Sequence, residues 1–216
     1  GIIANQPNCT IIGIDDLSGG YQEYVPAGVD FHQLDLSKDS IAPLFEAADI
    51  VYHFAAYAAE GLSPFIRKYN YNSNLVATAN VVNACIEHNI GRLVFTSSMA
   101  VYGHGNPPFN ESHQPNPIDP YGISKFEAEE QLLEFGRQSG LEVVVLRPPL
   151  VYGPGVKANF LKLLSAVACG IPLPLGAVNN KRSLVFVGNL ANAIATCLAH
   201  PKAKGRVYLV SDNSDV

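Results

Sequence analysis

The stretch "LEVVVLR" at residues 141–147 contains four successive apolar residues, three of them valine, and it decides the fold class. A strand with one face in water alternates apolar and polar side chains, whereas a strand covered by helices on both faces is apolar throughout. Strands of the second kind are typical of parallel sheets. The stretch therefore predicts a buried strand in a parallel sheet.

Short runs of the same kind recur along the chain. They are "CTIIGID" (9–15), "VDFHQLD" (29–35), "DIVYHFA" (49–55), "RLVFTSS" (92–98) and "RVYLVS" (206–211). Helical patterns are expected at residues 39–48, 64–89, 121–139, 157–170 and 188–200. The alternation of strands with helices is typical of βαβ units, so we expect an α/β fold.

The pattern changes after residue 150, where "RPPLVYGPG" and "GIPLPLG" are rich in proline and glycine and predict loops. We therefore expect residues 1–150 to form the main sheet domain. Residues 151–216 are expected to form part of a smaller lobe, with 188–211 returning to the sheet. Loops at the carboxyl ends of parallel strands are where open α/β sheets bind ligands.

Composition narrows the class of protein. The chain has 216 residues, 48% of them hydrophobic, and a net charge of −5 with no stripe of basic residues, which disfavours nucleic acid as a partner. No apolar run approaches the ~20 residues that cross a bilayer, and no signal peptide is recognisable. The four cysteines show no C-x-x-C pairing or metal-ligand spacing. We therefore expect a cytoplasmic protein with reduced thiols and no metal site.

Two acidic residues, Asp15 and Asp16, end an early strand. In a dinucleotide-binding unit, a carboxylate at the end of the second strand accepts hydrogen bonds from the ribose hydroxyls, and its charge repels a 2′-phosphate. This interpretation favours NAD over NADP. Equally, the two aspartates could simply start a turn before Gly19 and Gly20.

A glycine-rich turn should precede that strand by one helix. The sequence begins "GIIANQPN" instead, which is typical of the end of a helix, so the first strand and its glycines are expected to be missing from the printed sequence. The internal G-x-G-x-x-[GA] match is Gly153, Gly155 and Ala158. We reject it as the dinucleotide loop because Pro154 lies inside the turn and the match follows the last strand of the main domain.

A strand-end serine and a Tyr–Lys pair are the candidate catalytic residues. The strand at 92–98 ends in Ser98, where a hydroxyl can donate to a substrate oxygen, although serines are also common in turns. "DPYGISK" (119–125) places Tyr121 one helical turn before Lys125. With ten tyrosines in the chain, this spacing alone is weak evidence.

Several motifs together resemble one known family. They are "DIVYHFAA", "TSSMAVYG", "PYGISK", "RPPLVYGPG" and "RSLVFVGNLANAI". In this order they resemble the extended short-chain dehydrogenase/reductases, specifically the NAD-dependent nucleotide-sugar epimerase/dehydratase branch and its UDP-glucose 4-epimerase-like members. The resemblance implies a doubly wound, Rossmann-like parallel sheet with a small C-terminal substrate lobe. It also implies NAD as cofactor, a nucleotide-diphosphate sugar as substrate, and a homodimer paired through helix 64–89 and the helix after Tyr121.

The resemblance assigns catalytic roles to three residues. Tyr121 would take the proton from a sugar hydroxyl, Lys125 would hold the ribose and lower the pKa of the tyrosine, and Ser98 would hydrogen-bond the reacting oxygen. An ordinary phenol, with a pKa of about 10, is a poor base near neutrality, and a fixed positive charge beside it favours the phenolate.

Further binding positions also follow from the resemblance. The cofactor-binding residues are expected to be Asp15, Asp16, Asp35, Leu36, Phe54, Ala55, Ala56, Asn74, Tyr121, Lys125 and Pro148. The substrate-binding residues are expected to be Ser98, Met99, Tyr121, Asn159, Phe160 and Arg182. The rigid fork of an arginine suits a diphosphate, and this role is favoured for Arg182 over the alternative of a salt bridge at the rim. His53 is expected to be a core histidine.

The sequence also bears on the reaction. Dehydratases of this family need an acid and a base directly after the strand end, where this chain has Met99 and Ala100, so dehydration is disfavoured. We expect a UDP-hexose 4-epimerase. An NAD(P)H-dependent 4-ketoreductase and a truncated or inactive NAD-binding relative remain alternatives, and Leu150 stands where many epimerases have asparagine.

Overall fold

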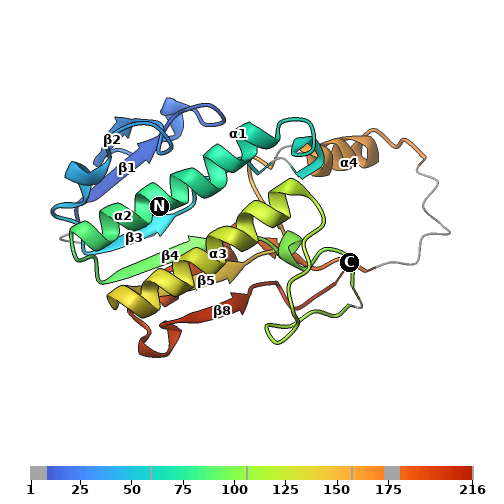
Figure 1. Ribbon diagram of the computed structural model, residues 1–216. Coiled ribbons are helices and arrows are strands. Elements are labelled where there is room, and N and C mark those ends of the chain that lie inside the picture. The colour runs from blue at the N-terminus through green and yellow to red at the C-terminus, as the bar shows by residue number, and fades with distance from the viewer. Residues whose placement is uncertain (1–8, 59, 106, 157, 173–180, 216) are drawn as a thin grey trace.

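The computed structural model describes residues 9–58, 60–105, 107–156, 158–172 and 181–215. Its main sheet has the strand order β3 (Ile50–His53), β4 (Arg92–Thr96), β5 (Glu142–Arg147) and β8 (Arg206–Leu209). All neighbouring strands in it are parallel. The predicted α/β fold with a parallel sheet is therefore confirmed (Figure 1).

A second pair of parallel strands continues this arrangement. β1 (Ile11–Asp15) pairs with β2 (Val29–Gln33), and among the described residues no ladder joins β1 to β3. Doubly wound sheets have the order 3-2-1-4-5-6, in which the first strand lies between the second and the fourth. β2 and β1 match two neighbouring places of that order, and β3, β4 and β5 match three other successive places.

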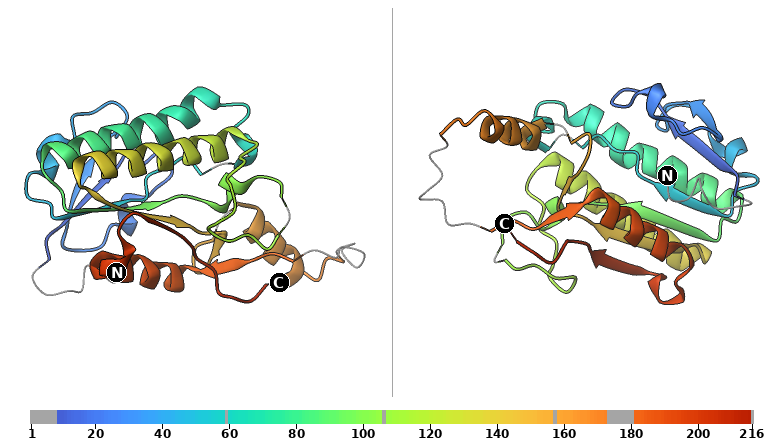
Figure 2. Two further views of the ribbon diagram at one scale, coloured as in Figure 1. Left: turned by 60° about the horizontal axis from the view of Figure 1, so that its bottom comes forward. Right: turned by 180° about the vertical axis from the view of Figure 1, so that it is seen from behind.

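Helices cover both faces of the main sheet. α1 (Arg67–Tyr71), a π-helical segment (Asn72–Val76) and α2 (Ala77–Glu87) follow one another as one helix, which lies with α3 (Pro120–Ser139) on one face. α5 (Val187–Ala199) lies on the other face (Figure 2).

The valine run explains this arrangement. Successive side chains of a strand point to opposite faces. Val143 and Val145 are buried in the cluster that contains α2 and α3, whereas Val144 is buried with Cys197 of α5. Each fully buried valine or leucine contributes roughly 1.5–3 kcal/mol, so the strand binds both layers together.

Two expectations about elements were wrong. The helix predicted at 39–48 is a single 3₁₀ turn, Ala42–Phe45, because one turn already buries Ile41 and Phe45 and so short a helix gains little from its own hydrogen bonds. The predicted loop "RPPLVYGPG" contains a strand, β6 (Leu150–Tyr152), which pairs in parallel with β7 (Leu184–Phe186). The remaining elements are α4 (Ala158–Ala168) and short 3₁₀ turns at Gln22–Tyr24, Glu60–Leu62, Met99–Tyr102 (η5) and Pro201–Ala203.

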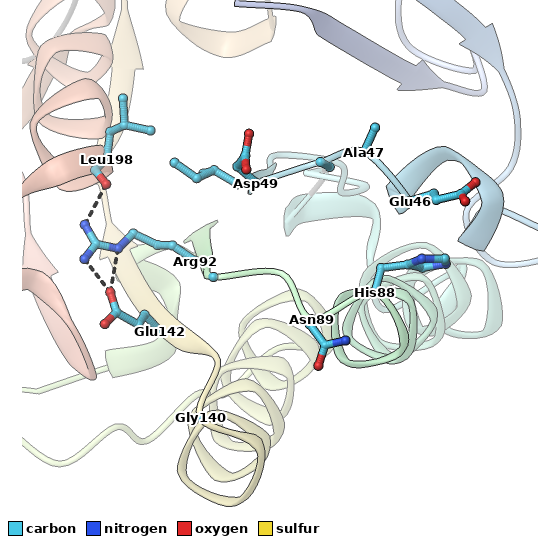
Figure 3. A pocket seen from close by; sticks show the side chains of 12 residues that line it. Glu46, Ala47, Asp49, His88, Asn89, Arg92, Gly140, Glu142 and Leu198 are labelled. Atoms are coloured by element: carbon cyan, nitrogen blue, oxygen red, sulfur yellow. Dashed lines mark hydrogen bonds and ion pairs between the residues drawn. The ribbon is translucent and has the colours of Figure 1, made fainter.

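An open cavity of about 880 Å³ lies at the amino-terminal edge of the main sheet (Figure 3). Arg92 lines this cavity and donates hydrogen bonds to Glu142 and to the backbone oxygens of Cys197 (2.8 Å) and Leu198 (2.6 Å). A cation at these carbonyls satisfies the free groups at the end of α5. We therefore interpret this edge as structural. In the part of the chain that is described, no helix is long and apolar enough to span a membrane.

Candidate active site

The predicted site residues follow the carboxyl ends of neighbouring parallel strands. Asp15 ends β1, Phe54 follows β3, Ser98 follows β4 and Pro148 follows β5. These ends lie on the same side of the molecule, toward which the strand arrows point (Figure 1). Open α/β sheets bind their ligands in the crevice outside these ends.

Ser98 precedes η5 and caps it, and the residue after it is anchored to the next strand. Its backbone is extended, and its Oγ accepts a hydrogen bond from the amide of Ala100 at 3.1 Å, as a cap does. The amide of Met99 donates to the backbone oxygen of Pro148 at 3.0 Å. Ser98, Met99 and Pro148 are thus held at one place, where β4 and β5 end.

Tyr121 lies at the start of α3, close to η5. The Asp119 carboxylate caps this helix and accepts from the amides of Tyr121 (2.9 Å) and Gly122 (3.1 Å). A Cβ on Gly122 would lie 2.7 Å from the backbone oxygen of Ala100, so this glycine permits a contact that no other residue allows. The helix that carries Tyr121 therefore begins against the segment that follows Ser98.

Lys125 is buried beneath this contact, with only 1% of its surface exposed. Its Nζ lies 4.0 Å from the centre of the Phe95 ring of β4, a cation–π distance. Burial lowers the pKa of Lys125 to about 7, and the charge of Glu129 acts in the opposite direction. The lysine is therefore fixed in place, and its charge depends on its neighbours.

His53 is a buried neighbour of Lys125 rather than a member of the catalytic set. Its Nε2 lies 2.8 Å from Thr78 Oγ1, and burial together with the charge of Lys125 lowers its pKa to about 3. It is neutral at physiological pH. The expectation of a core histidine is confirmed.

Asn74 connects three elements of the site. It lies in the π-helical segment, where its Oδ1 accepts from the amide of Tyr57 (2.7 Å) and its Nδ2 donates to Ser124 Oγ (3.0 Å). Ser124 Oγ in turn donates to the backbone oxygen of Tyr121 at 2.8 Å. The loop after β3 is thereby connected to α3, and π-helical segments are frequent at such functional places.

The acidic residues near β1 and β2 are turn formers in this structure. Asp15 accepts from the amide of Leu17 at 2.7 Å and Asp16 from that of Ser18 at 2.8 Å. Asp15 nevertheless remains exposed at the end of its strand. Its position therefore still allows hydrogen bonds from a ribose.

The Asp35 carboxylate accepts more hydrogen bonds than those of Asp15 and Asp16. Hydrogen bonds from Lys38 and Ser37 lower its pKa to about 2. The backbone oxygen of its neighbour Leu36 accepts from Asn80 Nδ2 at 2.9 Å, and the Leu36 side chain packs on the core. Phe54 is half exposed after β3, and Ala55 and Ala56 are partly buried.

The predicted substrate residues lie further away, on separate elements. Asn159 is exposed on α4, where the ring centre of Phe160 lies 6.3 Å from that of Tyr152. Arg182 is exposed just before β7. Figure 1 shows α4 to one side of the sheet, on the side toward which the strands point. The structure thus holds Ser98, Met99 and Pro148 at one place and starts the helix of Tyr121 against Ala100, whereas Asn159 and Arg182 stand on other elements.

Gly153 has a packing role. Its φ is +152°, and a Cβ there would lie 2.6 Å from Val187 Cγ1. Close packing against Val187 therefore accounts for a glycine at this position, and a phosphate-binding loop is not needed to explain it. Within the described ranges, no group of three or more His, Cys, Asp or Glu side chains is arranged to hold a metal ion.

Comparison with known proteins identifies the family. The profile of the NAD dependent epimerase/dehydratase family matches residues 3–211. The chain belongs to this family. A UDP-glucose 4-epimerase from Vibrio cholerae is 48% identical over 147 residues, which are 66% of this chain and 45% of the relative. An N-acetyl-alpha-D-glucosaminyl-diphospho-ditrans,octacis-undecaprenol 4-epimerase from Escherichia coli O157:H7 is 32% identical over 78% of this chain and 51% of its own length. The chain thus spans about half the length of these two relatives.

Solved structures support the same assignment. The UDP-glucose 4-epimerase of Thermus thermophilus in complex with NAD superposes with a TM-score of 0.84 at 29% identity, over 95% of this chain and 70% of that one. The UDP-N-acetylglucosamine 4-epimerase of Methanobrevibacter ruminantium M1, in complex with UDP-N-acetylmuramic acid, gives a TM-score of 0.86 at 28% identity, over 96% and 70%. These likenesses confirm the predicted family and its doubly wound, Rossmann-like sheet.

Proposed function

We propose that the full-length protein is an NAD-dependent nucleotide-sugar 4-epimerase, with a UDP-hexose as substrate. The observation that carries the proposal is that α3, which bears Tyr121 and Lys125, begins against the η5 turn that Ser98 caps, with Gly122 in contact with Ala100 and Lys125 Nζ against Phe95 of β4. Relatives named as 4-epimerases support the reaction type.

The residues present fit an NAD molecule. The exposed Asp15 carboxylate at the end of β1 suits the ribose hydroxyls of the adenosine half. Asp16, Asp35, Leu36, Phe54, Ala55, Ala56, Asn74 and Pro148 are proposed to line the same cofactor, together with Tyr121 and Lys125. Residues 1–150 would form this NAD-binding domain in the cytoplasm, and 151–216 part of the substrate lobe, which would hold the nucleotide through Asn159, Phe160 and Arg182.

The protein groups supply proton transfer and orientation. When bound, NAD supplies a hydride acceptor that later returns the hydride to the other face of the sugar. Tyr121 takes the proton of the sugar hydroxyl, and the charge of Lys125 favours the phenolate that does so. The Ser98 hydroxyl donates to the same sugar oxygen and holds it in place.

The segment after Ser98 argues against dehydration. Met99 and Ala100, the first residues of η5, have no side-chain group that can transfer a proton. Elimination of water needs such a group beside the leaving hydroxyl. Transfer of hydride without elimination is the reaction that these residues can support.

A homodimer is also part of the proposal. Phe65 is 83% exposed, and Tyr69 and Val76 of the first long helix and Phe135 of α3 are also exposed apolar side chains. Surfaces of this kind mark protein interfaces. Light scattering after size exclusion should give a dimer, and Val76→Glu should give a monomer, whereas the control Leu163→Glu on α4 should leave the dimer intact. A monomeric parent protein would contradict this part.

The reaction can be tested without added cofactor. The full-length protein, as purified, should interconvert UDP-glucose and UDP-galactose in an NMR assay, because a resident cofactor is regenerated in each cycle. Tyr121→Phe should abolish the interconversion. If no interconversion occurs but NADPH is consumed with a 4-keto UDP-sugar, the protein is a ketoreductase and the epimerase proposal is wrong.

A further inference from the structure

A buried ion pair lies behind the catalytic lysine. Glu129 of α3 and Arg147 of β5 are 1% and 5% exposed, and Arg147 Nε donates to the two carboxylate oxygens at 3.0 and 3.1 Å. Arg147 Nη1 also donates to the hydroxyl of Tyr102 at 2.7 Å. Removing two charges from water costs about as much as their attraction returns, so stability alone is a weak reason for such a pair.

The pair joins the three elements of the candidate site. Glu129 follows Lys125 by one helical turn on α3, Tyr102 ends the η5 turn that begins after Ser98, and Arg147 directly precedes Pro148. One hydrogen-bonded group thus spans α3, β5 and η5. A movement of any of these elements would break one of its bonds.

The pair also sets the charge around Lys125. This lysine interacts with His53 of β3, which is neutral, with the Phe95 ring of β4 and with Glu129 of α3, and Tyr121 precedes it by one helical turn. Arg147 contacts Glu129, and Tyr102 contacts Arg147. Glu129 is the one carboxylate in this set. Residues four apart on a helix have neighbouring side chains, so its charge acts on Lys125 at short range.

We propose that Glu129, held by Arg147, which in turn donates to Tyr102, is a positioning residue that keeps Lys125 cationic and fixes α3 against η5. Arg147 orients the carboxylate and opposes its charge only in part, because it approaches Glu129 from β5, whereas Lys125 stands on the same helix as Glu129. This inference deepens the proposed function, since it gives Lys125 the charge that Tyr121 needs.

The test reads the protonation of Lys125 directly. The full-length protein is labelled with ¹³Cε-lysine, and the signal that disappears in Lys125→Met is assigned to Lys125. In Glu129→Gln the midpoint of the Lys125 titration should fall, because the carboxylate is lost and the Arg147 charge is no longer paired. In Arg147→Met the midpoint should rise, because the carboxylate is no longer opposed. The control Glu134→Gln, on the exposed face of the same helix, should change nothing.

The titration midpoint of Lys125 should shift in opposite directions in Glu129→Gln and Arg147→Met, and this distinguishes the positioning role from simple packing. A pair that serves only packing would lower stability in both variants and leave the midpoint unchanged, and that result would overturn the proposal. If Glu129→Gln fails to fold, the double variant Glu129→Gln/Arg147→Met carries the test, and its midpoint should still fall. Glu129→Asp, which keeps the charge, should restore the original midpoint. Because this readout needs no turnover, it stands even if the protein proves not to be an epimerase.

Discussion

At the scale of single residues, the account depends on how Lys125 keeps a charge in the core. Burial lowers its pKa to about 7 from the ordinary 10.5. The Phe95 ring and the Glu129 carboxylate are the groups that favour the charged form. A lysine in this setting responds to small changes around it, as catalytic lysines do.

This burial predicts a pH-dependent stability. Below pH ~7 both folded and unfolded chains hold the Lys125 proton, and the full cost of burying the charge is present. Between about pH 7 and 10.5 the unfolded chain holds a proton that the folded chain has lost, so stability rises with pH. Lys125→Met should therefore be more stable than the unaltered chain at pH ~6, with an advantage that shrinks toward pH ~9.

Urea unfolding of the 216-residue chain at both pH values measures this difference. The exposed Lys162→Met is the matched control and should show no such change. If the free energies of unfolding of Lys125→Met and the unaltered chain differ by the same amount at both pH values, the pKa of Lys125 does not change on folding, and the prediction is wrong.

Gly122 gives a second prediction at this scale. In Gly122→Ala, the new Cβ would meet the Ala100 backbone oxygen at 2.7 Å, and that atom cannot rotate away. Overpacking of this kind costs about 1–3 kcal/mol of unfolding free energy, measured by urea titration. The exposed Glu130→Ala on the same helix should cost much less. Equal effects would show that α3 and η5 are not tightly packed.

The sequence predicted some site residues and could not predict others. Ser98, Tyr121 and Lys125 stand in local motifs at a strand end and a helix start, where spacing carries a signal. Glu129 and Arg147 meet across 18 residues of chain, and a single charge on a mostly polar helix gives no sign of its partner. The cap Asp119 could have been found, because an Asp before proline is a helix-start signal.

At the scale of elements, the start of α3 controls the catalytic tyrosine. The Asp119 carboxylate satisfies two amides of the first turn, those of Tyr121 and Gly122. Asp119→Ala should lower the free energy of unfolding by about 0.5–2 kcal/mol in urea titrations. Asp119→Asn, which keeps an acceptor, should recover most of the loss. If both variants equal the unaltered chain, the cap has no energetic role.

The elements themselves were predicted with unequal success. The strands of the main sheet could be predicted because their residues are apolar on both faces. Val145 packs against the helices on one face of the sheet, and Val144 packs on the other face. The strands β6 and β7 were missed because three residues each give too little pattern. The π-helical segment around Asn74 also left no trace in the sequence, and the partners of Asn74 in it, Tyr57 and Ser124, are distant along the chain.

At the scale of the whole molecule, the sheet is divided in two. Among the described residues, β1 is paired with β2 alone and β3 with β4 alone, whereas β4 and β5 are hydrogen-bonded on both sides. Edges with few partners open more readily than central strands. The two-stranded part should therefore be the less stable part of the 216-residue chain.

Hydrogen exchange measured by mass spectrometry tests this expectation. Peptides that cover β1 and β2 should exchange faster than those that cover β4 and β5 in the 216-residue chain. The central strands should exchange only through global unfolding. Equal protection of both parts would show that β1 and β2 are stabilised by contacts other than the ladders described.

The whole account depends on Lys125 making Tyr121 basic. The most direct measurement is the titration of ¹³Cζ-tyrosine in the full-length protein, in which the signal that disappears in Tyr121→Phe is assigned to Tyr121. The account predicts that Tyr121 loses its proton at a lower pH than an ordinary phenol, and that Lys125→Met removes this difference. A Tyr121 signal that titrates with the exposed tyrosines in both proteins would contradict it.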